Sequence, residues 1–241
     1  MKKTTFFTAL LFFAITLTSS AQAFDPYAKY LYSVKLGLTG GINTMFLNKK
    51  SPLYQVDSPV IGYNVGASFE KRFSERVSLV LNVNYQKTSY NSEIVNYFRY
   101  LTTGNSAAYP NLKNEIVFEY LNIPLLLRFY INYDKQLFID AGGYYNHLIT
   151  AKEFNKQTAI RGPFSDDSNQ IYYSEDAGFV LGLGYNFEVD DTNNFAIVLR
   201  DNYGLLNIVQ TGYLDTPTYA NVVSLQLNYT VNSNKSRVKK K

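Results

Sequence analysis

The most regular feature of this chain is an alternation of apolar and polar positions. Between residues 63 and 85, one set of alternate positions is apolar and the other set is polar or small. The apolar set is Tyr63, Val65, Ala67, Phe69, Val77, Leu79, Leu81, Val83 and Tyr85, and the other includes Asn64, Gly66, Ser68, Glu70, Ser78, Asn82 and Asn84. A period of two is typical of β-strands with unlike faces, so this segment predicts two strands joined by a turn at residues 73–76.

The same pattern returns along the rest of the chain. A second hairpin is predicted over residues 120–148 with its turn at 132–135, and a third over 178–203 with its turn at 189–194. Single strands are predicted at residues 32–40 and 221–231. Together these segments give about eight strands, a number at which side chains can just fill the interior of a closed barrel.

The connections between these strands alternate between short and long. Three are tight turns, whereas four are long, at about residues 42–59, 88–117, 150–176 and 205–219. Outer-membrane barrels have short periplasmic turns and long extracellular loops, so both termini are expected in the periplasm. Aromatic residues in the long loops, such as Tyr90 and Tyr97, could form an extracellular recognition surface or could simply pack within the loops.

The chemistry of the two strand faces distinguishes a membrane barrel from a soluble one. The apolar face is rich in Leu, Ile, Phe and Val, whereas the other face carries charges and several glycines, such as Gly182 and Gly184. A soluble ligand-binding barrel would turn its apolar face inward around a pocket, but small and polar residues suit a crowded, wet interior. The predicted fold class is therefore all-β, an eight-stranded antiparallel up-and-down transmembrane β-barrel.

Composition agrees with a barrel and excludes a helical membrane protein. Aromatic residues make up 16% of the chain, yet the mean hydropathy is only −0.17. No long apolar stretch follows the first residues, so spanning helices are not expected. Transmembrane barrels do collect aromatic residues, because these gather at both membrane interfaces.

The N-terminus has the features of a secretory signal peptide. Lys2 and Lys3 precede an apolar run over residues 6–17, and the sequence Ala-Gln-Ala ends at Ala23. Residues 1–23 are therefore expected to be a signal peptide, residues 24–231 the outer-membrane barrel domain, and residues 232–241 a basic periplasmic tail.

Charge and cysteine content exclude several classes of function. Of the 23 basic residues, seven lie in the signal peptide and the tail, which leaves 16 against 19 acidic residues. No basic stripe remains within the barrel, so nucleic acid is not an expected partner. The chain has no cysteine, which excludes a lipid attachment site, disulfides and thiolate metal sites. It has one histidine, which leaves few ligands for any other metal site. We expect no metal and no cofactor.

One strand resembles a known family. Residues 118–130, FEYLNIPLLLRFY, are similar to the "YLEIPLLLK" strand of the PorT-type outer-membrane β-barrel proteins of the Bacteroidetes. An aromatic Gly-Gly strand follows here, at residues 141–145, as it does in the family. Asn122 stands where the family has an acidic residue. The resemblance implies an outer-membrane barrel, and the founding member's link to protein secretion implies a component of a secretion or transport assembly as one alternative function.

Charged residues on the polar face are the first candidate site. Register across the turn at residues 132–135 is expected to bring Arg128 opposite Asp140, where unlike charges pair. These charges are interpreted as a structural plug of paired groups, with a gated ion path as the alternative. The full set is Lys35, Glu70, Arg128, Asp140, Glu188 and Arg200.

A second candidate site lies at the rim of the barrel. His147 is predicted near a strand end, with Ser174 and Asp176 near it across the rim, and a lipid A-modifying enzyme could use such a set. The main expectation is nevertheless a non-enzymatic barrel with a structural or interaction role in the bacterial envelope. Its expected partners are outer-membrane lipid and, as further candidates, other envelope or secretion proteins.

Overall fold

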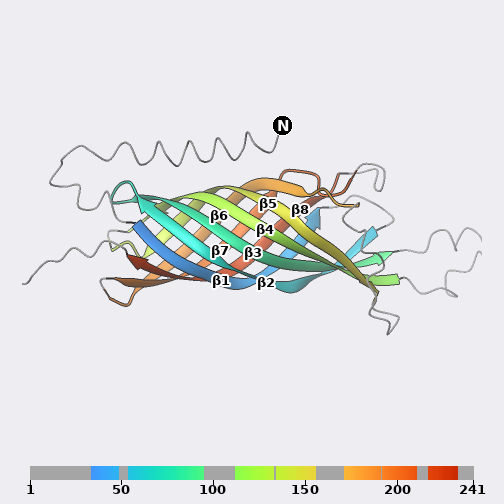
Figure 1. Ribbon diagram of the computed structural model, residues 1–241, viewed down its shortest axis with the longest axis horizontal. Helices are drawn as coiled ribbons and strands as arrows, with labels where there is room; N and C mark the ends of the chain where they lie inside the picture. Colours follow the sequence, from blue (N-terminus) through green and yellow to red (C-terminus); the bar gives the residue numbers. More distant parts are fainter. Residues whose placement is uncertain are drawn as a thin grey trace, which may run out of the picture.

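The chain folds into one closed antiparallel barrel, in which each strand pairs with the next in sequence and the last pairs with the first (Figure 1). The computed structural model describes residues 34–48, 54–94, 112–132, 134–155, 171–190, 192–210 and 217–232. The strands are β1 (Val34–Asn48), β2 (Tyr54–Arg72), β3 (Val77–Ile94), β4 (Leu112–Tyr130), β5 (Leu137–Asn155), β6 (Glu175–Glu188), β7 (Asn193–Gly204) and β8 (Tyr219–Asn232). This confirms the predicted fold class. The predicted signal peptide and nearly all of the predicted basic tail lie outside the described residues.

The two ends of the barrel differ in their connections. The short connections at residues 73–76, 131–136 and 189–192 lie at one end, together with the start of β1 and the end of β8, at the left of Figure 1. We call this the turn end and the opposite end the loop end. Side chains fix the turns: Asn132 Oδ1 accepts from the backbone nitrogens of Gln136 and Leu137 at 2.9 and 3.0 Å. Asp190 accepts bonds from Asn193 and Thr192, and these hydrogen bonds lower the pKa of Asp190 to about 2.

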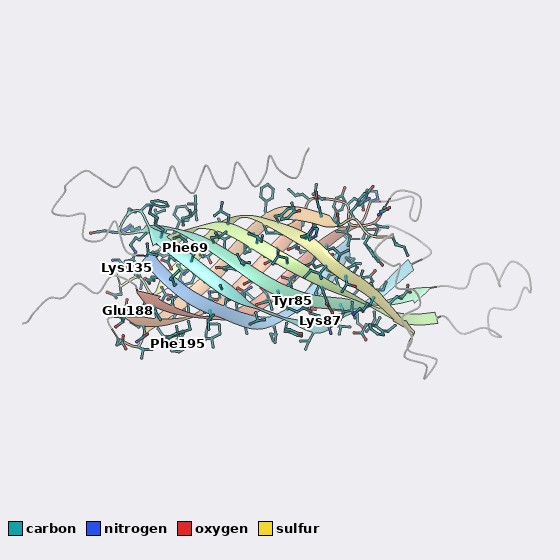
Figure 2. The ribbon with its side chains drawn as sticks, in the orientation of Figure 1. Phe69, Tyr85, Lys87, Lys135, Glu188 and Phe195 are labelled. Atoms are coloured by element: carbon teal, nitrogen blue, oxygen red, sulfur yellow. The ribbon has the colours of Figure 1, made fainter. Side chains whose placement is uncertain are left out.

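The outer face of the barrel is apolar, and the inner face is largely polar. Leu38 is 66% exposed on the outside, whereas Asp140 is fully buried inside. Figure 2 shows Phe69 and Phe195 near the turn end, with Lys135 and Glu188 farther out at that end. It shows Tyr85 towards the loop end, with Lys87 beyond it. The outer surface between these aromatic residues is apolar, and we call it the lipid-facing belt. On β3 the belt runs from Val77 to Tyr85, about nine residues, the length of strand that spans a membrane.

The strands are longer than predicted and the loops correspondingly shorter. The predicted connections at residues 42–59, 88–117 and 150–176 are partly strand, because β1 to β5 continue beyond the belt. The wall formed by β2 to β5 is therefore taller than the wall of β6 to β8. Sequence alternation fades there because inward-facing residues near the loop end, such as Tyr90 and Phe118, are apolar too. Within the described residues no helix is long and apolar enough to cross a membrane.

Replacing Leu125 by arginine tests the lipid-facing belt. Leu125 lies on the outer face at the middle of the belt, and we expect Leu125→Arg to lower the free energy of unfolding by about 2–4 kcal/mol in lipid vesicles. The same change at Ile61, which lies beyond Tyr63 towards the loop end, should cost at most about 1 kcal/mol, because the penalty falls towards the interface. Urea-induced unfolding would measure both. Equal costs at the two positions would contradict the assignment of the belt.

Candidate functional site

The half of the interior nearer the turn end contains a buried ion cluster centred on Asp140. Arg128 from β4 lies directly opposite Asp140 on β5, and its Nε and Nη2 donate to Asp140 Oδ1 and Oδ2 at 2.8 and 3.0 Å. Arg200 from β7 donates through Nη2 to the same Oδ2 at 3.0 Å. Gly182 on β6 lies between Asp140 and Arg200 in the register. Because Gly182 has no side chain, Arg200 can reach across β6 to the carboxylate.

A second carboxylate extends the ion cluster to the other side of the barrel. Arg128 Nη1 lies 3.2 Å from Glu70 Oε2, and the Tyr130 hydroxyl donates to Glu70 Oε1 at 2.7 Å. Lys35 lies opposite Glu70 in the register of β1 and β2. The guanidinium of Arg128 also stacks 3.7 Å from the centroid of the Phe138 ring. Arg128, Arg200, Asp140 and Glu70 therefore each have an oppositely charged partner, which a buried charge requires.

The structure brings together most of the charged residues predicted for the interior. Lys35, Glu70, Arg128, Asp140 and Arg200 all point inward and are buried. Glu188 does not join them, because it is the last residue of β6 and its side chain is exposed at the turn end (Figure 2).

A row of amide side chains crosses four neighbouring strands inside the barrel. Asn84 donates to Asn122 at 3.3 Å, Asn122 donates to Asn146 at 2.6 Å, and Asn146 donates to Asp176 at 3.1 Å. Each of these residues lies directly opposite the next in the strand register. The Tyr144 hydroxyl also donates to Asp176, at 3.0 Å. We call this row the amide ladder. The amide ladder was not predicted from the sequence, although all four residues share the inward parity of their strands.

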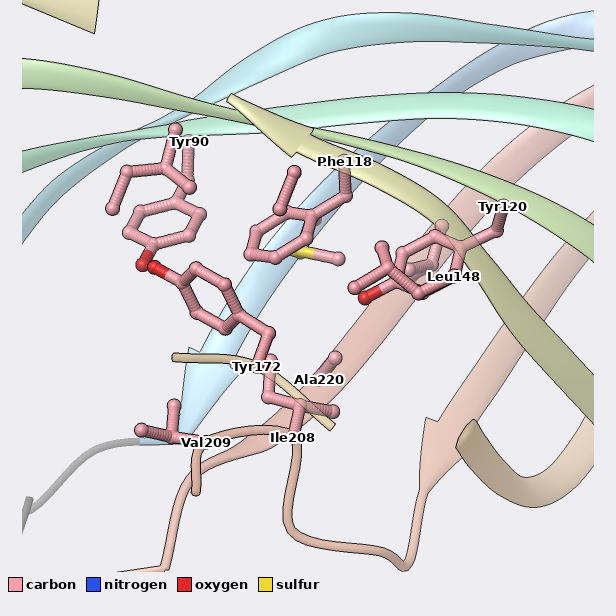
Figure 3. Packing of buried hydrophobic residues seen from close by; sticks show 12 residues of the cluster. Tyr90, Phe118, Tyr120, Leu148, Tyr172, Ile208, Val209 and Ala220 are labelled. Carbon is pink, nitrogen blue, oxygen red and sulfur yellow. The ribbon is translucent and has the colours of Figure 1, made fainter. Parts of the chain in front are cut away.

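Near the loop end the interior is filled by apolar and aromatic side chains (Figure 3). Phe118 is fully buried and contacts three rings, with Tyr90 and Tyr120 stacked at 6.0 and 5.8 Å and Tyr172 edge-on at 4.8 Å. A bridge between Tyr172 and Val209 joins two segments that lie outside the strands. We call this cluster the aromatic plug; it consists of Met45, Tyr90, Ile116, Phe118, Tyr120, Leu148, Ala151, Tyr172, Ile208, Val209, Ala220 and Val222.

The aromatic plug corrects one expectation about the loops. Tyr90 was considered for an extracellular recognition surface, but it is a buried residue of β3 and its hydroxyl hydrogen-bonds that of Tyr172. The two hydroxyl oxygens lie next to each other in Figure 3. Tyr97, the other example, lies outside the described residues.

The residues predicted for a rim site do not converge. His147 shares the outer face of β5 with Tyr145 and lies opposite Glu175. Asp176 is the next residue along β6, so it points inward, where it ends the amide ladder. Ser174 is exposed, and its backbone oxygen accepts from the Leu148 nitrogen at 2.8 Å. In the described part of the chain, no group of three or more His, Cys, Asp or Glu side chains is arranged to hold a metal.

Several solved structures are similar to this barrel. The barrel is similar to the attachment invasion locus protein Ail of Yersinia pestis, with 12% identity over 82% of this chain and 98% of that chain and a TM-score of 0.41. It is also similar to OprG from Pseudomonas aeruginosa, with 14% identity, coverages of 83% and 94% and a TM-score of 0.41. Neisserial surface protein A shows 10% identity, coverages of 82% and 96% and a TM-score of 0.43. No curated protein matches.

The sequence also matches a family profile over most of its length. The match is to the outer membrane protein beta-barrel domain and spans residues 21–210, which include seven of the eight strands. The chain therefore belongs to the outer membrane protein beta-barrel domain family, and it is an outer-membrane β-barrel protein.

Proposed function

We propose that this protein has a structural or interaction role in the outer membrane, with a closed lumen and no enzymatic activity. One observation carries this proposal: the ion cluster, the amide ladder and the aromatic plug fill the lumen one after another, and their side chains are buried. An eight-stranded barrel encloses a space that side chains can fill completely, so this filling leaves little room for solute.

The positions of the rim residues favour a non-enzymatic role over lipid A modification. A nucleophile needs an oriented base within hydrogen-bond reach. His147 and Asp176 point to opposite faces of the barrel wall, so neither Asp176 nor the amide ladder can orient the histidine. The carboxylate beside His147 is that of Glu175, which is exposed.

The proposed orientation has the turn end and both termini in the periplasm. Short turns on the periplasmic side and longer connections outside are the usual arrangement in outer-membrane barrels. The taller wall of β2 to β5 would then extend above the outer surface and hold the long connections towards extracellular or envelope partners. The proposed export signal over residues 1–23 and the resemblance to PorT-type proteins of the Bacteroidetes agree with a location in the outer membrane.

Conductance of the purified barrel in a planar lipid bilayer tests the closed lumen. The wild type is expected to stay at the baseline of the bilayer, and Arg128→Ala is expected to do so too, because the amide ladder and the aromatic plug remain in series with the altered ion cluster. A large porin with a water-filled channel is the positive control. Discrete current steps from the wild type would contradict the proposal and support the gated ion path instead.

A further inference from the structure

The outer face of β5, β6 and β7 contains a groove of about 710 Å³. Its floor is low because Ala141 and Gly143, two successive outward positions of β5, have little or no side chain. Phe179 and Leu181 lie opposite these two residues on β6 and project outward, each with 63% of its surface exposed. Most of the lining is apolar, and the groove lies within the lipid-facing belt.

One carboxylate also lines this groove. Asp201 lies opposite Leu181 on the outer face of β7, one outward position before Tyr203. With the Asn221 amide oriented to donate, its nitrogen lies 2.9 Å from Asp201 Oδ1. Within the described residues, Asp201 Oδ2 makes no further hydrogen bond or ion pair. A charged group on the lipid face of a barrel destabilises the protein unless something compensates it, and the penalty falls towards the interface.

The groove therefore offers two kinds of contact at fixed positions. Its apolar floor suits a hydrocarbon chain, which is what surrounds the rest of the belt. The free oxygen of Asp201 suits a cation that can also donate hydrogen bonds, because charge-assisted bonds are the strong ones. A lipid with a primary amine in its headgroup supplies both groups in one molecule.

We propose that this groove is a binding site for one membrane lipid. The acyl chain lies over Ala141 and Gly143, and the protonated amine of the headgroup bonds to Asp201. The site selects its lipid by the amine, whereas the remainder of the belt contacts acyl chains without selecting a headgroup. This proposal requires the lipid-facing belt and a primary-amine lipid in the leaflet at the loop end, where Asp201 lies. It does not depend on whether the lumen conducts.

Two matched glycines allow the groove to be filled without disturbing the interior. A Cβ at Gly143 would meet the backbone oxygen of Gly178 at 3.4 Å, and a Cβ at outward-facing Gly40 on β1 would meet that of Asn64 at 3.7 Å, so both positions accept a side chain. Gly143→Leu fills the groove, and Gly40→Leu adds the same side chain to the outer face elsewhere. Asp201→Asn removes the charge and preserves the shape.

The experiment is native mass spectrometry of the folded full-length barrel, released from nanodiscs that contain equal amounts of phosphatidylethanolamine, phosphatidylcholine and phosphatidylglycerol with identical acyl chains. The wild type is expected to retain one phosphatidylethanolamine about tenfold over either other lipid, the ratio that about 1.4 kcal/mol produces. Asp201→Asn should lose this preference, and Gly143→Leu should lose the bound lipid. Gly40→Leu should behave like the wild type.

Several results would overturn the proposal. These are an equal yield of the three lipids from the wild type, an unchanged preference in Asp201→Asn, and a retained lipid in Gly143→Leu. Release of a dimer that Asp201→Asn abolishes would assign the groove to a second copy of the chain and would overturn the lipid site. The heat-dependent shift in gel migration shows independently that each variant is folded, so loss of lipid cannot be mistaken for loss of the barrel.

Discussion

Replacement of Asp140 by alanine is expected to lower the free energy of unfolding by about 3–5 kcal/mol, the cost of removing one partner from a buried ion pair. Asp140 is fully buried and accepts three hydrogen bonds from Arg128 and Arg200. In the variant, Arg200 would retain Gln226 but lose its carboxylate, and Arg128 would retain Glu70 as an ionic partner. Equilibrium unfolding in urea, with the protein in lipid vesicles, would measure the loss.

Asp134→Ala is the matched control, because Asp134 is an exposed aspartate in the turn between β4 and β5. A surface substitution of this kind should change stability by no more than about 0.5 kcal/mol. Adding Arg200→Met to Asp140→Ala, which leaves Arg128 paired with Glu70, should restore part of the loss, because a buried ion group can often be replaced by an apolar group of similar volume. A loss below about 1 kcal/mol for Asp140→Ala would contradict the central position of this carboxylate in the ion cluster.

The barrel could be predicted because its strands obey a simple rule within the belt. Every second residue contacts lipid there, so positions such as Leu79, Leu81 and Val83 had to be apolar while Asn82 and Asn84 did not. Beyond the belt this requirement ends: Lys87 and Glu119 face outward beside each other, while Phe118 faces inward. The alternation of apolar and polar positions therefore does not predict the strand ends that lie beyond the belt.

The ion cluster could be predicted only in part. Parity places a residue on the inner face, and the tight turn places Arg128 opposite Asp140. Parity does not show that Arg200 reaches Asp140 across β6, because that contact depends on the register of β5, β6 and β7 and on the space left by Gly182. Parity also does not distinguish a buried position in the interior from an exposed position at the turn end. This is why the sequence predicted Glu188 in the interior.

The register between β5 and β6 determines both the amide ladder and the separation of the rim residues. His147 lies opposite Glu175, and the adjacent pair of Asn146 and Asp176 therefore faces inward. A shift of one residue in this register would exchange the faces and bring Asp176 to the side of His147. Long connections do not fix a register from sequence, so neither the amide ladder nor the separation of the rim residues could be derived before the strands were paired.

Phe118→Ala is expected to lower the free energy of unfolding by about 3–5 kcal/mol, because it leaves a cavity at the centre of the aromatic plug. Phe118 is completely buried and contacts Tyr90, Tyr120 and Tyr172. These rings come from β3, from β4 and from a segment outside the strands, so the surrounding walls cannot easily close the space. Urea-induced unfolding in lipid vesicles would measure the loss.

Tyr173→Ala is the control for this change, because the Tyr173 side chain is exposed although its neighbour Tyr172 is buried. Its cost should remain near 0.5 kcal/mol, about the size for a surface position. A double-mutant cycle between Phe118→Ala and Tyr172→Ala should give a coupling of about 0.5–1.5 kcal/mol, because the two rings pack edge-on at 4.8 Å. If Phe118→Ala costs no more than Tyr173→Ala and the coupling is absent, the aromatic plug does not pack as a unit, and the closed lumen would then depend on the ion cluster and the amide ladder alone.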